Sequence, residues 1–145
     1  MINFEISTLV DRPIDEVFAF ISNPLNMPKW QVMVAKVEQL IPGVIGIGSK
    51  FNVKAGMLGR AMEGVMEITD YEPPTKFGFT NRLGPIQMKA AVALKPVGTG
   101  TKITLNVQGN PDGLFKIAEG PMAQQIKIQM EANLEKLKSV LEAMI

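Results

Sequence analysis

The sequence TKITLNVQ, at residues 101–108, alternates apolar and polar side chains, with Ile103, Leu105 and Val107 on the apolar side. This period of two predicts a β-strand with one buried face. The sequence MAQQIKIQMEANLEKLKSVLEAM, at residues 122–144, instead repeats its apolar side chains every three or four residues, which predicts an amphipathic helix. The change of period between the two stretches indicates a sheet followed by one long C-terminal helix.

The period of two extends backward through most of the chain. Residues 2–10 alternate in this way, and so do further stretches from about residue 33 to 109. The connectors are short and turn-like: Leu58-Gly59, Glu72-Pro73-Pro74, Leu83-Gly84-Pro85 and Val97-Gly98-Thr99-Gly100. Such connectors join antiparallel neighbours, because a parallel crossover needs about a dozen residues. The pattern predicts a seven-stranded antiparallel sheet with one apolar face.

A short helical corner is expected after the first strand. Pro13 suits the start of a helix, and Asp15 and Glu16 follow where the helix dipole favours anions. The apolar side chains that follow have the spacing of one buried helix face: Ile14, Val17, Phe18 and Ile21. Residues 23–30 contain two prolines and hold at most one helical turn, so we expect them to carry Trp30 toward the core.

The C-terminal helix carries one apolar face, made of Met122, Ile126, Met130, Asn133, Leu137, Val140 and Met144 and flanked by Leu134 and Leu141. Gly120-Pro121 is expected to kink or divide this helix. A sheet with one apolar face needs a covering layer, and no other predicted element is long enough. The predicted fold class is α+β: a helix-grip fold in which a curved seven-stranded antiparallel sheet wraps around the long C-terminal helix.

The composition predicts one globular domain spanning residues 1–145, with 46% hydrophobic and 20% charged residues. The sequence contains no cysteine, which removes disulfides, thiolate metal sites and cysteine nucleophiles. It also contains no histidine, the commonest general base and a usual metal ligand. We therefore expect no metal and no cofactor. Any catalysis would use Asp, Glu, Lys, Arg, the single Tyr71 or backbone groups.

Charge and hydropathy restrict the partners and the location of the protein. The formal net charge of +1 gives no long-range field to attract nucleic acid or an anionic bilayer. No stretch approaches the roughly 18 apolar residues that span a membrane, and the N-terminus lacks the features of a signal peptide. We expect a cytoplasmic protein, monomeric or homodimeric, without nucleic-acid binding or membrane insertion.

Several short motifs follow one another in a distinctive order: PIDEVF at 13–18, ISNP at 21–24, PKW at 28–30, GIG at 46–48, YEPP at 71–74 and LEKLKSVLE at 134–142. In this order and spacing, over essentially the whole chain, the sequence resembles the Bet v 1-like or START-like (SRPBCC) superfamily. That superfamily contains the polyketide cyclase/dehydrase and lipid-transport family. The resemblance implies a helix-grip fold with a ligand cavity between sheet and C-terminal helix.

The resemblance does not select one function, because fold and function are separable. The superfamily includes lipid and hormone carriers, aromatase/cyclases, ring-hydroxylating oxygenase domains, co-chaperone domains and toxin-partner proteins. The oxygenase domains hold iron with two histidines and a carboxylate, which the absence of histidine excludes here.

The inward face of the predicted sheet is rich in methionine and phenylalanine, which are adaptable or large apolar side chains suited to a hydrophobic cavity. With the inward helix face and the corner tryptophan, it gives the candidate ligand-binding residues Trp30, Phe51, Val53, Met57, Met62, Met66, Phe77, Phe79, Asn81, Met88, Ala90, Met122, Ile126, Met130 and Asn133. The alternative is that these side chains pack as ordinary core. For Trp30 that alternative is a structural plug between corner and sheet.

Polar residues on the inward faces have roles of two kinds. Asn81 and Asn133 could bond a ligand's hydroxyl or carbonyl, or each other or the backbone, since buried polar groups need partners. Glu119 falls on the same helix face as Asn133. If Glu119 points inward it is the candidate catalytic acid or base, and otherwise it is exposed at the cavity mouth. Tyr71 falls on the solvated face and is expected to be a strand-end residue.

Three functions remain open. The first is binding of a small hydrophobic ligand, lipid-like, polyketide or aromatic, by a carrier or sensor. The second is a cyclase/dehydrase-like enzyme that moves protons with Glu119, the two asparagines or ordered water. The third is a co-chaperone-like protein-interaction module with a filled core.

Overall fold

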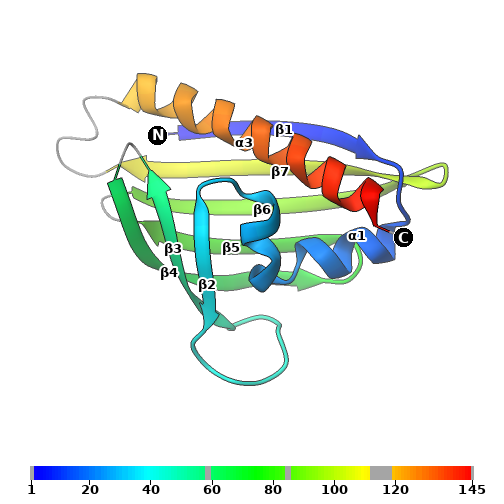
Figure 1. The fold of residues 1–145 in the computed structure, drawn as a ribbon, viewed down its shortest axis with the longest axis horizontal. Coiled ribbons are helices and arrows are strands. Elements are labelled where there is room, and N and C mark those ends of the chain that lie inside the picture. Colours follow the sequence, from blue (N-terminus) through cyan, green and yellow to red (C-terminus); the bar gives the residue numbers. More distant parts are fainter. Residues whose placement is uncertain (1, 58–59, 84–85, 112–118, 145) are drawn as a thin grey trace.

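The computed structural model describes residues 2–57, 60–83, 86–111 and 119–144. Its elements follow in the order β1 (Ile2–Val10), α1 (Ile14–Ile21), the 3-10 helix η1 (Pro24–Asn26), α2 (Met27–Trp30), β2 (Val34–Gln39), β3 (Lys50–Met57), β4 (Arg60–Glu72), β5 (Lys76–Leu83), β6 (Ile86–Val97), β7 (Gly100–Pro111) and α3 (Glu119–Ala143). Figure 1 shows one curved sheet with α3 laid across it. The predicted helix-grip fold is confirmed.

The strands form a single antiparallel sheet in the order β1-β7-β6-β5-β4-β3-β2. All neighbours in the sheet are neighbours in sequence except β1 and β7, which pair with Ile6 opposite Leu105. Along β7, Thr101, Ile103 and Leu105 are buried, whereas Lys102 is exposed and Thr104 is only partly buried. The alternation that predicted this strand therefore also predicted which of its sides faces the core.

A β-bulge in β4 changes the side on which the last residues of that strand lie. The pairing of β4 with β5 shifts register between Ile68 and Asp70. An extra residue in one strand reverses the alternation beyond it. Tyr71 consequently packs on the core side, edge-on to Phe18 and Phe77, with ring centroids 5.5 and 6.5 Å away. The prediction that Tyr71 lies on the solvated face was wrong.

Three short helices form the corner between β1 and β2. α1 begins after Pro13 and buries Val17, Phe18, Phe20 and Ile21. Asn23 then shapes the turn into η1, because its Oδ1 accepts a hydrogen bond from the N–H of Leu25 at 3.1 Å. Trp30 ends α2 and is 5% exposed. The prediction that this corner carries Trp30 to the core is confirmed. The expectation of at most one helical turn in residues 23–30 was wrong, because η1 and α2 follow each other there.

α3 is one uninterrupted element from Glu119 to Ala143, with Gly120-Pro121 in its first turn. Proline is tolerated there because the first N–H groups of a helix have no intrahelical acceptor. The predicted kink is absent from residues 119–143, and the predicted division before them concerns residues 112–118, outside the described residues. Leu134, Leu137 and Leu141 are buried, whereas Met144, beyond the end of the helix, is 44% exposed. Met144 does not share the buried face predicted for it.

The C-terminal end of α3 is tied to the β1–α1 corner. The Nε of Arg12 donates to the carbonyl oxygen of Leu141 at 2.8 Å, and the backbone N–H of Asp11 donates to Oε2 of Glu142 at 2.9 Å. The hydroxyl of Thr101 donates to the carbonyl oxygen of Arg12 at 2.8 Å, which links the corner to β7. A guanidinium at the last carbonyl groups of a helix also interacts favourably with the helix dipole.

The chain passes so close to the start of β7 that Gly100 has no room for a side chain. A Cβ at this position would lie 2.6 Å from the carbonyl oxygen of Val10 and 3.6 Å from the Cα of Asp11. We expect Gly100→Ala to lower the free energy of unfolding by about 1–3 kcal/mol, because backbone must move to admit the methyl group. Urea denaturation would measure this loss.

Gly46→Ala is the matched control, because a Cβ at Gly46 meets no atom within 4 Å. We expect this variant to remain within about 0.5 kcal/mol of the original protein. Equal stability of the two variants would contradict the close approach at Gly100.

Candidate functional site

A cavity of about 140 Å³ lies between the sheet, the corner helices and α3. Its floor includes two small inward-facing residues, Ala55 on β3 and Ala90 on β6, each 7% exposed. Above it, the first half of α3 contributes Ile126 and Met130, whereas the leucines of the second half pack into the core. This volume stays unfilled because the side chains on the sheet are small and because the first half of α3 packs less deeply than the second.

Most of the predicted ligand-binding residues meet in the wall of this cavity: Trp30, Val53, Phe77, Phe79, Asn81, Met88, Ala90, Ile126, Met130 and Asn133. They come from α2, β3, β5, β6 and α3, so they are brought together only by the folded sheet and helix. Their contact with a ligand stays a prediction.

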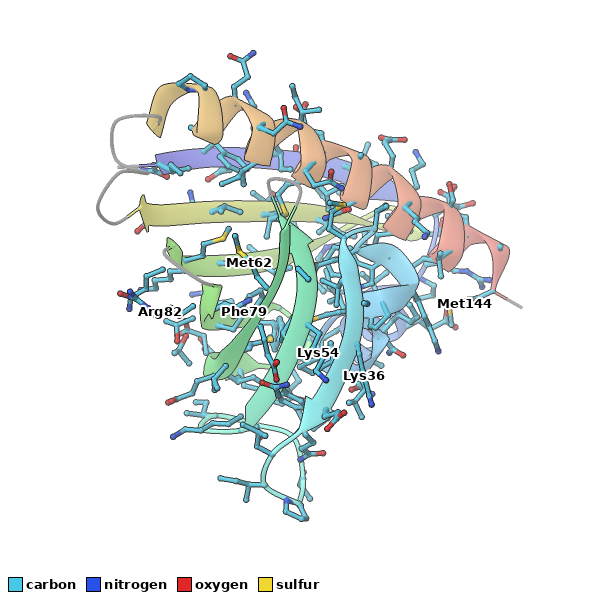
Figure 2. The ribbon with its side chains drawn as sticks, turned by 60° about the vertical axis from the view of Figure 1, so that its left-hand side comes forward. Lys36, Lys54, Met62, Phe79, Arg82 and Met144 are labelled. Atoms are coloured by element: carbon cyan, nitrogen blue, oxygen red, sulfur yellow. The ribbon has the colours of Figure 1, made fainter. Side chains whose placement is uncertain are left out.

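The other predicted residues lie elsewhere or outside the description. Phe51 and Met66 are fully buried in the core and are not part of the cavity wall. Met62 is half-buried, and Figure 2 shows it with Phe79 toward one end of the sheet. The side chains of Met57, Met122 and the candidate acid or base Glu119 lie outside the described residues.

Sequence reasoning missed part of the wall. The missed residues are Ile21, Pro24, Met27, Gln31, Met33, Val34, Ala55, Gly56, Val92, Leu105, Val107, Gln125 and Gln129. Apart from Gly56, the strand residues among them share the inward parity that the alternation predicted, so that signal was present. The three glutamines had no such signal. Gln125 and Gln129 lie beside the apolar face of α3, and Gln31 comes directly after α2.

Asn133 connects α3 to the chain that leads from α2 into β2. Its Oδ1 accepts hydrogen bonds from the backbone N–H of Val32 at 3.1 Å and from Nε2 of Gln129 at 3.3 Å. Its Nδ2 contacts the sulfur of Met130 at 3.8 Å. Asn133 is 2% exposed, so this buried amide has partners within the protein itself. A ligand, Asn81 and the backbone were the possible partners of Asn133, and the structure shows the bond to the backbone.

The described wall of the cavity is electrically neutral. Its residues are apolar apart from tryptophan and the amides of Asn81, Asn133, Gln31, Gln125 and Gln129, and none of the described ones carries a charge. Two buried polar atoms that belong to wall residues, Nε1 of Trp30 and Oδ1 of Asn81, have no hydrogen-bond partner among the described residues. The wall can therefore hold an apolar body and bond a neutral polar group.

Charged side chains lie on the outer face of the sheet instead. Figure 2 shows Lys36 on β2 and Lys54 on β3, which are directly opposite each other in the ladder. The Nζ of Lys36 lies 2.7 Å from Oε1 of Glu38. This hydrogen-bonded ion pair raises the pKa of Lys36 and lowers the pKa of Glu38. These charges act in solvent, away from the cavity.

A second hollow of about 580 Å³ lies between α1, the β2–β3 connection and the turn after β4. It is larger but open: Val44, on its wall, is 97% exposed. Neither of the buried atoms that lack partners belongs to its wall. The less open cavity under α3 is therefore the candidate site.

The curved antiparallel sheet, the long covering helix and the apolar cavity between them define a helix-grip protein. Residues 1–142 match the family model described as polyketide cyclase / dehydrase and lipid transport, and the chain belongs to this family. No curated protein matches the sequence. Within the described ranges, no helix is long and apolar enough to cross a bilayer.

Solved structures share the fold over nearly the whole chain. The Zhui aromatase/cyclase from Streptomyces sp. R1128 is 14% identical, with a TM-score of 0.77 over 97% of this chain and 93% of that one. A conserved protein from Geobacillus kaustophilus is 17% identical, with a TM-score of 0.77 over 96% and 94% of the two chains. Ara h 8.0201 is 17% identical, with a TM-score of 0.73 over 96% of each chain. At these identities the likeness shows the fold alone.

The contact between Asn133 and Val32 gives a test of how the cavity wall is held. Asn133→Leu keeps the size of the side chain but removes the acceptor of the Val32 N–H. We expect the free energy of unfolding to fall by about 1 kcal/mol. Because the segment is released locally, we also expect faster hydrogen exchange at the amide of Val32.

Gln124→Leu is the control, since it makes the same kind of change on the exposed side of α3. Unchanged exchange at Val32 in the Asn133→Leu variant would show that the hydrogen bond does not hold this segment.

Proposed function

We propose that this protein binds a small, largely apolar molecule in the cavity between the sheet and α3. The observation that supports this proposal most strongly is the cavity itself, which lies between strands and helices and is lined by apolar and neutral amide side chains. Concave, mostly apolar pockets with a few polar groups are the usual form of small-molecule sites. Membership of a family described as polyketide cyclase / dehydrase and lipid transport supports the proposal.

The volume of the cavity restricts the size of the ligand. Pockets for drug-sized ligands begin at roughly 300 Å³, about twice the 140 Å³ observed here. A dry cavity of roughly 150 Å³ still holds one benzene ring. The ligand that fits without rearrangement is therefore a molecule the size of one aromatic ring.

Four methionines allow the cavity to accept somewhat larger guests. The four are Met27 in α2, Met33 just before β2, Met88 in β6 and Met130 in α3. Their unbranched side chains change rotamer at low cost. A long acyl chain or a fused polycycle would need several of them to move together, so the proposal favours the smaller ligand.

Catalysis is the second candidate, and the family description, which includes polyketide cyclase / dehydrase, supports it. Acid–base chemistry needs a titratable group within hydrogen-bond reach of the substrate. The described part of the wall carries none, and the candidate Glu119 has no described side chain. A protein-interaction module was expected to have a filled core, which the cavity disfavours.

Filling the cavity provides the first test. Ala90→Leu directs a larger side chain from the floor of the cavity into its empty space. We expect toluene and indole to bind at least about tenfold more weakly, as measured by NMR titration. The fold should be retained, because the substitution fills a void rather than creating one.

Ala91→Leu is the matched control, since Ala91 is the next residue on the same strand and is exposed. If neither toluene nor indole nor any co-purified molecule detected by native mass spectrometry binds the original protein, the proposed function is wrong. If both variants weaken binding equally, the ligand binds outside this cavity.

The pH dependence of binding provides a second test. Because no titratable side chain is present among the described wall residues, we expect the dissociation constant of p-xylene to change less than about twofold between roughly pH 5 and 9. A steep change in this range would indicate an ionisable group at the ligand, for which Glu119→Gln is the variant to compare.

A further inference from the structure

Two hydrogen-bonding atoms in the candidate site are left without partners. The Nε1 of Trp30 and the Oδ1 of Asn81 are both buried and have no hydrogen-bond partner within the described residues. Their side chains belong to residues that are 5% and 8% exposed, and both residues line the cavity under α3. Buried polar groups in proteins are nearly always bonded, so each of these two needs an explanation.

The third buried polar residue of the wall shows that the fold satisfies such groups where they serve its own structure. Asn133 bonds the backbone of Val32 and the side chain of Gln129. Among the described residues, Nε1 of Trp30 and Oδ1 of Asn81 have no such partner, although an apolar residue of similar shape would avoid the cost of burying an unpaired group. These two buried atoms are therefore available to a partner that the described residues do not provide.

The chemistry of the two groups defines what completes them. An indole N–H only donates a hydrogen bond, so Trp30 requires an acceptor. A carboxamide offers an oxygen and an NH₂ group, and a half-turn about its last torsion exchanges them, so Asn81 can accept or donate. The described wall contains no cation that would neutralise an anionic ligand, and an unpaired buried charge is costly. The complementary group is thus a neutral oxygen, as in a hydroxyl or carbonyl.

We propose that Trp30 and Asn81 are the specificity residues of the cavity, and that they select a neutral, oxygen-bearing molecule of about one aromatic ring, such as a phenol. This inference rests on the proposed function, since it assigns the ligand class of the same site. The apolar body of the ligand lies against the methionine and phenylalanine side chains. Its oxygen bonds Trp30, Asn81 or both.

The test compares p-cresol with p-xylene, which differ by a hydroxyl in place of a methyl group. Trp30 is the single tryptophan of the chain, so its indole N–H gives one unambiguous NMR signal during titration. We expect p-cresol to bind about tenfold more tightly than p-xylene and to shift that signal, since an apolar guest leaves both polar groups unpaired.

Asn81→Leu should abolish most of this preference, because leucine has a similar shape and no polar atoms. The same variant should have an unchanged or higher melting temperature, since it removes a buried group that lacks a partner. A residue with a purely structural hydrogen-bonding role would show the opposite, a loss of stability. Trp30→Phe is the second variant, and Asn106→Leu, on the outward-facing side of β7, is the control expected to retain the preference.

The outcomes separate this inference from the function on which it rests. Binding of both probes with equal affinity, or a preference for p-cresol that survives in Asn81→Leu and Trp30→Phe, overturns the specificity role and leaves the binding cavity intact. Binding of neither probe overturns the proposed function together with the inference. If Trp30→Phe fails to fold, the ratio of affinities in Asn81→Leu decides.

Discussion

The apolar face of the sheet must be covered, and α3 is the element that covers it. Burying leucines such as Leu134, Leu137 and Leu141 contributes about 1.5–3 kcal/mol each, and the bonds of Arg12 and Asp11 hold that end of the helix against the first strand and the corner. The second half of α3 is fixed in the core. Its first half lies over the floor of the cavity, and its side chains do not fill the space below. The cavity is thus a consequence of packing one straight helix against one curved sheet.

The sequence predicted the regular elements well because their physical signals are local. Period-two alternation predicted the strands and the buried side of most of them, and the motifs around Pro13 and Trp30 predicted the helical corner. Tyr71 was assigned to the wrong face because a bulge depends on how two strands pair, which alternation in one strand does not reveal. Met144 was assigned to the buried helix face because periodicity alone does not mark where a helix ends.

The candidate site was predictable to the extent that strand parity defines it. Val53, Phe77 and Ala90 were placed by counting residues along strands, and they line the cavity. Its volume was not predictable, because it depends on how closely α3 approaches the sheet. Nor was the bond from Val32 to Asn133, which joins residues 101 positions apart and leaves no periodic trace. The difference between the satisfied amide of Asn133 and the unsatisfied amide of Asn81 likewise appears only in three dimensions.

The thioether wall of the cavity has a chemical consequence beyond its pliability. Methionine is oxidised to a sulfoxide, which is polar, bulkier and chiral, and is restored by dedicated reductases. Met33 is 41% exposed and forms part of the wall, so an oxidant in solvent reaches it before the buried Met27 and Met88. Oxygen added to that sulfur would place a strong hydrogen-bond acceptor beside an apolar guest. The same side chains that let the cavity adapt its shape thus make its polarity sensitive to the redox state of the surroundings.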